Sequence, residues 1–271
     1  METKIDLEWD DVHVLPSKIY PDVAFLFQRI NDVVTKRVEL DGEDVMLDIG
    51  CGRAVDAIQL AKRGGNCVGL DPSRKMVNYA KECITDSGVA VSLIQGIGES
   101  LPLKTGSLDE VICKGALDHF PHPAKAIEEI ARVLKPQGEA IIVIANFESL
   151  GFRLGRWFFT IEKVLLRGRT KRRDVWQIPA DHTYKFDYTT LKRLVKPYLK
   201  AKQCTGISLL FGLPGWSSLL DKLPQSVSLT ILRALDKLAY HLPSLSDAIL
   251  LECTYNNGLR IDSDTGKSST S

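Results

Sequence analysis

Short apolar runs alternate with helical patterns over residues 45–146. The apolar runs are continuous, which is typical of strands that are buried on both faces. They lie at 45–50, 66–71, 89–96, 108–115 and 139–146. Helical patterns lie between them at 53–64, 73–88 and 123–138. This alternation of strands and helices predicts an α/β fold, in which helices cover both faces of a parallel sheet.

The pattern changes after residue 150. Residues 151–180 are rich in aromatic and basic side chains and interrupt the alternation. Beyond them we expect a helix at 187–199, a strand at 200–212, two Leu-rich helices within 214–243 and a last strand at 247–256. The polar stretch 259–271 is expected to be a disordered tail.

The chain is therefore expected to form one domain over residues 1–258. Its core would be residues 40–147, and the segments 151–180 and 214–243 would be insertions that form a helical cap.

Composition limits the classes of protein only slightly. Of the 271 residues, 44% are hydrophobic and 25% are charged, and the formal net charge is +1. These are ordinary globular values, and they point to no acidic or basic partner. The six cysteines are scattered, which indicates reduced thiols and a cytoplasmic protein without a metal site. The acidic start lacks the apolar run of a signal peptide, and no later run is long enough for a membrane span.

A glycine-containing turn follows the first predicted strand. It reads Asp48-Ile-Gly50-Cys51-Gly52-Arg53-Ala54, and Asp71 ends the second strand. Glycines let a ligand approach the backbone closely, and a carboxylate at the second strand can accept hydrogen bonds from a ribose diol. Val55 stands where a dinucleotide-binding fingerprint needs its third glycine, so an NAD(P)-dependent dehydrogenase is disfavoured. A ligand with a ribose and a zwitterionic tail, but no pyrophosphate, fits this pattern better.

Four segments carry a family resemblance in order and spacing. They are VMLDIGCGRAVDAIQLAKRG, VGLDPSRKMVNYAK, GESLPLKTGSLDEVICKGALDHFPHP and EEIARVLKPQGEAIIV. Together they resemble the motifs of class I S-adenosylmethionine-dependent methyltransferases, and they are most similar to the small-molecule group that includes ubiquinone and menaquinone methyltransferases. The resemblance covers about residues 40–150. It implies a Rossmann-like, doubly wound, mainly parallel sheet of seven strands, the last of them antiparallel.

The resemblance also implies S-adenosylmethionine as cofactor and a small acceptor molecule, lipophilic molecules included. It places Asp48, Gly50 and Gly52 beside the methionine part of the donor and Asp71 on the ribose hydroxyls. The expected donor site is completed by Cys51, Pro72, Gly98, Glu99, Lys114 and Tyr20. The backbone amides of Gly98 and Glu99 would hold the adenine, and Tyr20, before the first helix, would close over the donor.

Two positions depart from the family pattern. Ala54 stands where relatives often have a third glycine, and Ile97 replaces an aspartate near the adenine amino group. These changes keep a second interpretation open, namely a non-catalytic protein that retains the fold and binds the donor or serves as a scaffold.

Two histidines are candidate bases. Methyl transfer from a sulfonium depends mainly on positioning, and a base is needed only when the acceptor loses a proton. His119 follows the fourth strand, where it can act as a base or merely line the loop with Asp118. His182 leads into a late helix and can border the acceptor or be structural. The sequence does not identify the atom that is methylated.

Residues 153–173 form a basic and aromatic segment. They contain eight Lys or Arg residues and one acid, Glu162. This pattern fits a helix packed on the body, a lid over the acceptor or a peripheral contact with an anionic membrane. A nucleic-acid partner is not expected, because the overall charge is near neutral and the cluster is short.

Overall fold

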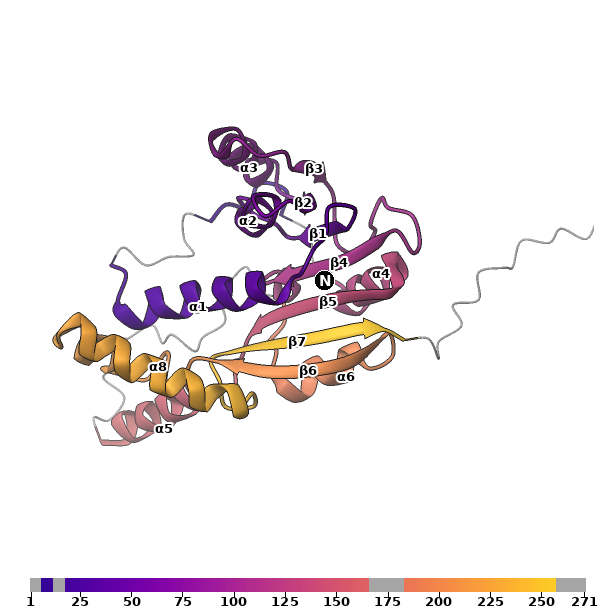
Figure 1. Ribbon diagram of the computed structural model, residues 1–271. Helices are drawn as coiled ribbons and strands as arrows, with labels where there is room; N and C mark the ends of the chain where they lie inside the picture. The colour runs from indigo at the N-terminus through magenta and orange to yellow at the C-terminus, as the bar shows by residue number, and fades with distance from the viewer. Residues whose placement is uncertain (1–5, 12–17, 166–182, 257–271) are drawn as a thin grey trace, which may run out of the picture.

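The computed structural model describes residues 6–11, 18–165 and 183–256, which form a three-layer α/β fold around one sheet (Figure 1). The sheet has seven strands in the order β3-β2-β1-β4-β5-β7-β6. The strands are β1 (Val45–Ile49), β2 (Asn66–Asp71), β3 (Ser92–Gln95), β4 (Leu108–Lys114), β5 (Leu134–Ala145), β6 (Leu199–Ile207) and β7 (Ala248–Tyr255). The first five pair in parallel, and β7 lies antiparallel between β5 and β6. The predicted fold class is confirmed.

Helices cover both faces of the sheet. They are α1 (Pro21–Arg37), α2 (Val55–Ala61), α3 (Arg74–Ser87), α4 (Pro123–Val133), α5 (Leu150–Leu165), α6 (Tyr188–Val195), α7 (Trp216–Asp221) and α8 (Gln225–His241), with a short 3₁₀ turn η1 (Leu117–His119). The core divides into two clusters because successive strand side chains point to opposite faces. Leu47 and Ile142 pack toward α4 and α6, whereas Met46 and Ile141 pack toward α1 and α2.

Local signals explain where several helices begin. The Ser73 hydroxyl accepts the backbone N–H of Met76 and caps α3, and the Asp187 carboxylate accepts that of Thr190 and caps α6. Pro123 occupies the first turn of α4, where its missing N–H costs nothing. These three helices therefore begin where the sequence predicts.

Two strands begin at positions that differ from the prediction. The third strand begins at Ser92 instead of residue 89, and the fifth begins at Leu134, inside the segment predicted to end a helix. The second difference coincides with an irregularity in the pairing of β4 with β5, where the extra residues lie in β5 between Leu134 and Glu139. A Cβ at Gly138 would lie 3.0 Å from the carbonyl oxygens of Leu108 and Asp109, so the chain there runs close along β4.

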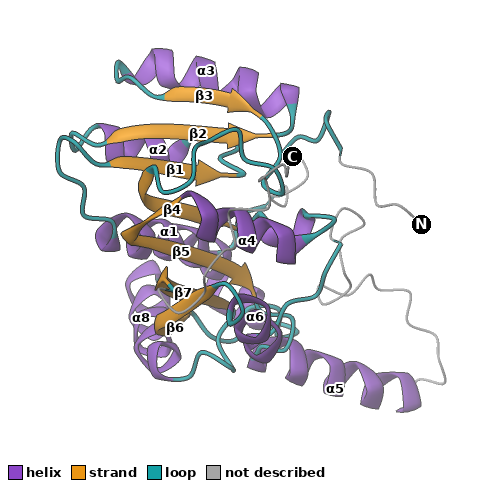
Figure 2. Cartoon of the chain, turned by 90° about the vertical axis from the view of Figure 1, so that its right-hand side faces the viewer, coloured by secondary structure: helices purple, strands orange, loops and turns teal. Residues whose placement is uncertain are grey.

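Two of the helices that follow β5, namely α5 and α8, lie in different parts of the fold. Helix α8 packs on β6 and beside α1, on one face of the sheet (Figure 1). Helix α5 extends away from the body, past the carboxyl ends of the parallel strands (Figure 2). No helix in the described part of the chain is both long and apolar enough to cross a bilayer. The cap formed by 151–180 and 214–243 stays a prediction, and the expected tail 259–271 lies outside the described residues.

Candidate functional site

The turn after β1 is held against the end of β2. The backbone N–H groups of Gly50 and Cys51 both donate to the Leu70 carbonyl, at 2.8 and 3.1 Å. Gly50 has φ +69°, and a Cβ there would overlap the Cβ of Ala116. Glycine is therefore required at this position on two grounds, its left-handed backbone and its contact with the loop after β4.

Ala54 also adopts a left-handed backbone, with φ 57°, directly before α2. This conformation costs a non-glycine residue about 1–2 kcal/mol. The turn thus keeps the geometry that glycine favours at the position where the resemblance expects glycine. Alanine tolerates the geometry because its side chain is small, and this side chain is fully buried.

Asp71 joins the two turns of the site. One carboxylate oxygen accepts the Gly52 N–H at 3.0 Å, and the other accepts the Ser73 N–H at 2.8 Å. Burial raises the pKa of this carboxyl, whereas the two backbone hydrogen bonds lower it. A carboxylate has about four lone-pair positions, so about two stay available for further donors. A vicinal diol such as that of a ribose supplies two.

Asp48 lies at the end of β1 within a buried charged network. Burial and the neighbouring Asp56 raise its pKa, and the Lys114 ammonium opposes that effect. Lys114 forms an ion pair with Asp56 and donates to the Asn31 side chain at 2.7 Å. The Lys114 ammonium thus contacts side chains of both α1 and α2, and its predicted contact with the donor stays a prediction.

The loop after β3 lies beside η1. A Cβ at Gly98 would come within 2.8 Å of the Phe120 ring, so glycine lets the ring pack there. Glu99 accepts the His122 N–H at 3.2 Å and is buried. Ile97, which replaces the expected aspartate, is half-buried in the same loop.

Three further residues were predicted for the donor site, namely Pro72, Tyr20 and Cys51. Pro72 follows β2 directly, and its carbonyl accepts from the Gln95 side chain at 3.3 Å. Tyr20 precedes α1, and the Lys18 ammonium lies 4.8 Å from its ring centroid. Burial raises the pKa of the Cys51 thiol, which disfavours the thiolate. All six cysteines are free.

Of the two candidate bases, the described residues include only His119. His119 lies close enough to Asp71 for the imidazole charge to lower the pKa of the Asp71 carboxyl. Burial, which raises that pKa, is the larger effect. A catalytic role for His119 stays a prediction. His182 lies outside the described residues. Thr183, next to it, donates its N–H to the Asp118 carbonyl at 2.8 Å.

Comparisons with known proteins match the same part of the chain. The family described as "Methyltransferase domain" matches residues 47–142. An uncharacterized methyltransferase, YcgJ, of Bacillus subtilis is 36% identical over 112 residues, which are 41% of this chain and 44% of the relative. A ubiquinone biosynthesis O-methyltransferase of Xylella fastidiosa is 32% identical over 124 residues, which are 45% of this chain and 50% of the relative.

Residues 47–142 match the methyltransferase-domain family, and these matches support a class I S-adenosylmethionine-dependent methyltransferase. The crystal structure of YcgJ shares the fold over 84% of this chain and 98% of that chain, with a TM-score of 0.55 and 21% identity. The chain spans about half the length of the curated relatives that it matches. The family resemblance of the sequence motifs is confirmed.

Residues 6–11, which the sequence interpretation missed, contact the glycine turn and the start of α3. The Ser73 hydroxyl donates to the Trp9 carbonyl at 2.5 Å, and the Arg74 N–H donates to the Leu7 carbonyl at 2.9 Å. Asp11 accepts two hydrogen bonds from Arg53 in the glycine turn, at 2.5 and 2.8 Å. The only sequence signal for this segment is its acidic character.

A second missed group lies where β6 ends and β7 begins, at the same edge of the sheet as the carboxyl ends of the parallel strands. Asp22 and Asp247 are buried, and each has one carboxylate oxygen that no described residue contacts by a hydrogen bond. The Trp216 indole N–H is buried too, and it has no acceptor within the described part of the chain. Burial raises the pKa of Asp247 to about 7, the Phe211 N–H and the Ser208 hydroxyl oppose this, and the Asp22 charge adds to it.

Proposed function

We propose that this protein transfers the methyl group of S-adenosylmethionine to a small acceptor molecule, lipophilic acceptors included. The observation that carries the proposal is Asp71, a buried carboxylate that holds the glycine turn and has acceptor capacity for a ribose diol. The proposal covers oxygen, nitrogen and carbon acceptors.

The residues of the site fit the donor. Gly50 and Gly52 keep the backbone of the turn free of side chains, and both have positive φ values of 69° and 53°. Asp71 offers acceptors to hydroxyl groups, and the half-buried Ile97 offers an apolar contact to an adenine ring. None of these features calls for a pyrophosphate.

The protein's contribution to the reaction is positioning. The donor supplies a methyl group on an activated sulfonium, and the remaining barrier is lowered by holding the acceptor in line with it. Residues 6–11 contact Ser73, Arg74 and Arg53, and we expect them to shield the donor from water there. Where the acceptor must lose a proton, His119 is the candidate base, because it lies close to Asp71.

A non-catalytic donor-binding or scaffold protein is the second candidate. It is favoured by Ala54 and Ile97, the two departures from the family pattern. The left-handed backbone at Ala54 weakens this candidate, since the turn keeps its geometry in spite of the substitution.

Calorimetry with three ligands tests the proposal. We expect S-adenosylmethionine and S-adenosylhomocysteine to bind at one site per chain, because they share the ribose and the zwitterionic tail. NAD is expected not to bind, since Val55 begins α2 where the dinucleotide fingerprint needs a glycine. Preferential binding of NAD would overturn the donor assignment. Donor binding without turnover on any small-molecule acceptor would favour the scaffold.

We further propose that α5 contacts the acceptor or the membrane that carries it. The helix is anchored at its start, because a Cβ at Gly151 would overlap the Phe211 carbonyl and Phe152 is buried. Farther along, Trp157 and Phe158 are 58% and 47% exposed. Exposed aromatic side chains on a projecting helix favour a lipophilic contact (Figure 2).

Hydrogen exchange of residues 151–165 distinguishes the two contacts. For a lid, exchange should slow when S-adenosylhomocysteine and a long-chain alkylphenol are present together, since a lid closes over both ligands. For a membrane contact, phosphatidylglycerol vesicles alone should slow it, and added salt should weaken the effect by screening. The double variant Trp157→Ser/Phe158→Ser should lose either response, and Leu238→Ser, an exposed leucine on α8, should keep it. Protection equal to that of the sheet under every condition would contradict both contacts.

A further inference from the structure

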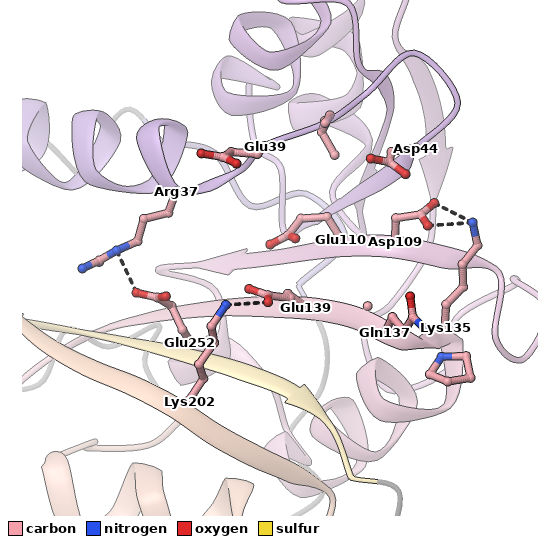
Figure 3. A pocket seen from close by; sticks show the side chains of 13 residues that line it. Arg37, Glu39, Asp44, Asp109, Glu110, Lys135, Gln137, Glu139, Lys202 and Glu252 are labelled. Carbon is pink, nitrogen blue, oxygen red and sulfur yellow. Dashed lines mark hydrogen bonds and ion pairs between the residues drawn. The ribbon is translucent and has the colours of Figure 1, made fainter.

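A charged cleft lies at the amino ends of the parallel strands, at the edge of the sheet opposite the glycine turn (Figure 3). Its volume is about 740 Å³, which is in the range of small-molecule sites. The end of α1, the starts of β4 and β5, and strands β6 and β7 contribute its walls.

Acidic side chains outnumber basic ones in this cleft. The six acids are Glu39, Asp44, Asp109, Glu110, Glu139 and Glu252, and the three bases are Arg37, Lys135 and Lys202. Each base pairs with one acid: Arg37 with Glu252 at 2.7 Å, Lys135 with Asp109 at 2.7 Å and Lys202 with Glu139 at 2.6 Å. Three acids are thus left without a basic partner among the described residues, namely Glu39, Asp44 and Glu110.

Glu110 is the most informative of the three. It is only 8% exposed, and its carboxyl points into the cleft, where no hydrogen bond or ion pair joins it to another described residue (Figure 3). Burial raises its pKa to about 9, Glu139 adds to this, Lys202 opposes it, and Glu252 and Asp44 add further. A buried carboxyl that lacks a partner inside a cleft is a group that a cationic ligand would satisfy.

The arrangement favours an organic cation over a metal ion. Among the described residues, which include the whole lining, no three acidic, His or Cys side chains are grouped closely enough to hold a metal. Carboxylates that are spread over a cleft instead suit several ammonium groups joined by a flexible chain. Leu40 and Pro136 lie among the lining residues and offer apolar contact to the methylenes of such a chain.

We propose that this cleft binds a small aliphatic polyamine, with one ammonium group on Glu110 and another at the rim near Glu39 and Asp44. A molecule of this class carries no anionic group, so it meets no repulsion from the unpaired carboxylates. Binding converts Glu110 from its protonated form to the carboxylate and therefore releases a proton.

The cleft is separate from the donor site. Glu110 lies near the start of β4 and Lys114 at its end, four residues farther on. This separation corresponds to about 13 Å along a strand. Polyamine binding can therefore be measured without the donor, and its outcome does not depend on the methyl-transfer proposal.

Titration calorimetry with putrescine and spermidine tests the inference. At low ionic strength we expect saturable binding with one site per chain and release of about one proton, measured in buffers of different ionisation enthalpy. Glu110→Gln should weaken binding by at least about tenfold and abolish the proton release, because the charged acceptor is gone. This variant should fold normally, since glutamine has the shape of the protonated glutamic acid, the form that burial favours at Glu110.

Glu128→Gln is the matched control. Glu128 is an exposed glutamate on α4, away from the cleft, so its loss should leave both affinity and proton release unchanged. Failure of both polyamines to bind the wild-type protein would overturn the inference. Equal binding of polyamine by Glu110→Gln and the wild-type protein would also overturn the inference, because polyamine would then be attracted only by the general negative charge of the surface.

Discussion

Replacing Asp71 with alanine is expected to weaken the binding of S-adenosylhomocysteine about tenfold to a hundredfold. A hydrogen bond to a charged group contributes about 1.5–3 kcal/mol, and each 1.4 kcal/mol changes affinity about tenfold. In the wild-type protein the Asp71 carboxylate accepts hydrogen bonds from the backbone N–H groups of Gly52 and Ser73. The variant loses these two hydrogen bonds as well. Calorimetry measures the loss directly.

A second ligand separates ribose recognition from damage to the turn. An S-adenosylhomocysteine analogue without the ribose 2′-hydroxyl should bind the wild-type protein less tightly than the parent compound. Asp71→Ala should bind the two compounds equally, because the partner of that hydroxyl is missing. Asp86→Ala, which removes an exposed acid from α3, should behave as the wild-type protein does. A persistent preference of Asp71→Ala for the hydroxylated compound would refute ribose binding by Asp71.

Gly50→Ala is expected to have the largest effect on both stability and donor binding. The left-handed backbone costs about 1–2 kcal/mol, and forcing a methyl group against Ala116 costs about 1–3 kcal/mol more. The free energy of unfolding in urea should therefore fall by about 2–5 kcal/mol. Donor affinity should fall about a hundredfold or more, because relief of the overlap displaces the turn that approaches the ligand.

Two further variants separate backbone strain from overlap. Gly106 has a similar φ of +65°, but a Cβ there meets nothing within 4 Å, so Gly106→Ala should lose only about 1–2 kcal/mol and keep its donor affinity. Adding Ala116→Gly to Gly50→Ala removes the atom that the new methyl group would strike, and it should restore part of the donor affinity. If Gly50→Ala and Gly106→Ala lost equal stability, the overlap with Ala116 would have no energetic role.

The residues of the site that were predicted from the sequence lie at the ends of two consecutive strands, β1 and β2. Gly50 and Gly52 follow a recognisable strand, and Asp71 ends the next one. Parallel strands bring such turns to the same edge of the sheet, so their proximity follows from the order of elements. The structure agrees, because Gly50 donates to Leu70 and Gly52 donates to Asp71.

Contacts between distant segments escaped sequence interpretation. Asp11 meets Arg53, and Asp22 influences Asp247 across more than two hundred residues of chain. None of these three acids, Asp11, Asp22 and Asp247, carries a periodic or motif signal, because an isolated acid looks the same in the sequence whether it is solvated or buried. Lys114 pairs with Asp56, a neighbour that only the packing of α2 on the sheet provides, and its contact with the donor stays a prediction.

The sequence by itself determined the class of fold, the order of its strands and helices along the chain, and the glycine turn with its acidic partner. These features depend on local patterns, namely continuous apolar runs, helical periods and residues that tolerate special backbone angles. Tertiary structure alone decided the position of β7 between β5 and β6, the contact of residues 6–11 with the start of α3, and the cleft around Glu110. The physical reason is that burial, charge coupling and unmet hydrogen bonds arise only when elements far apart in sequence pack together.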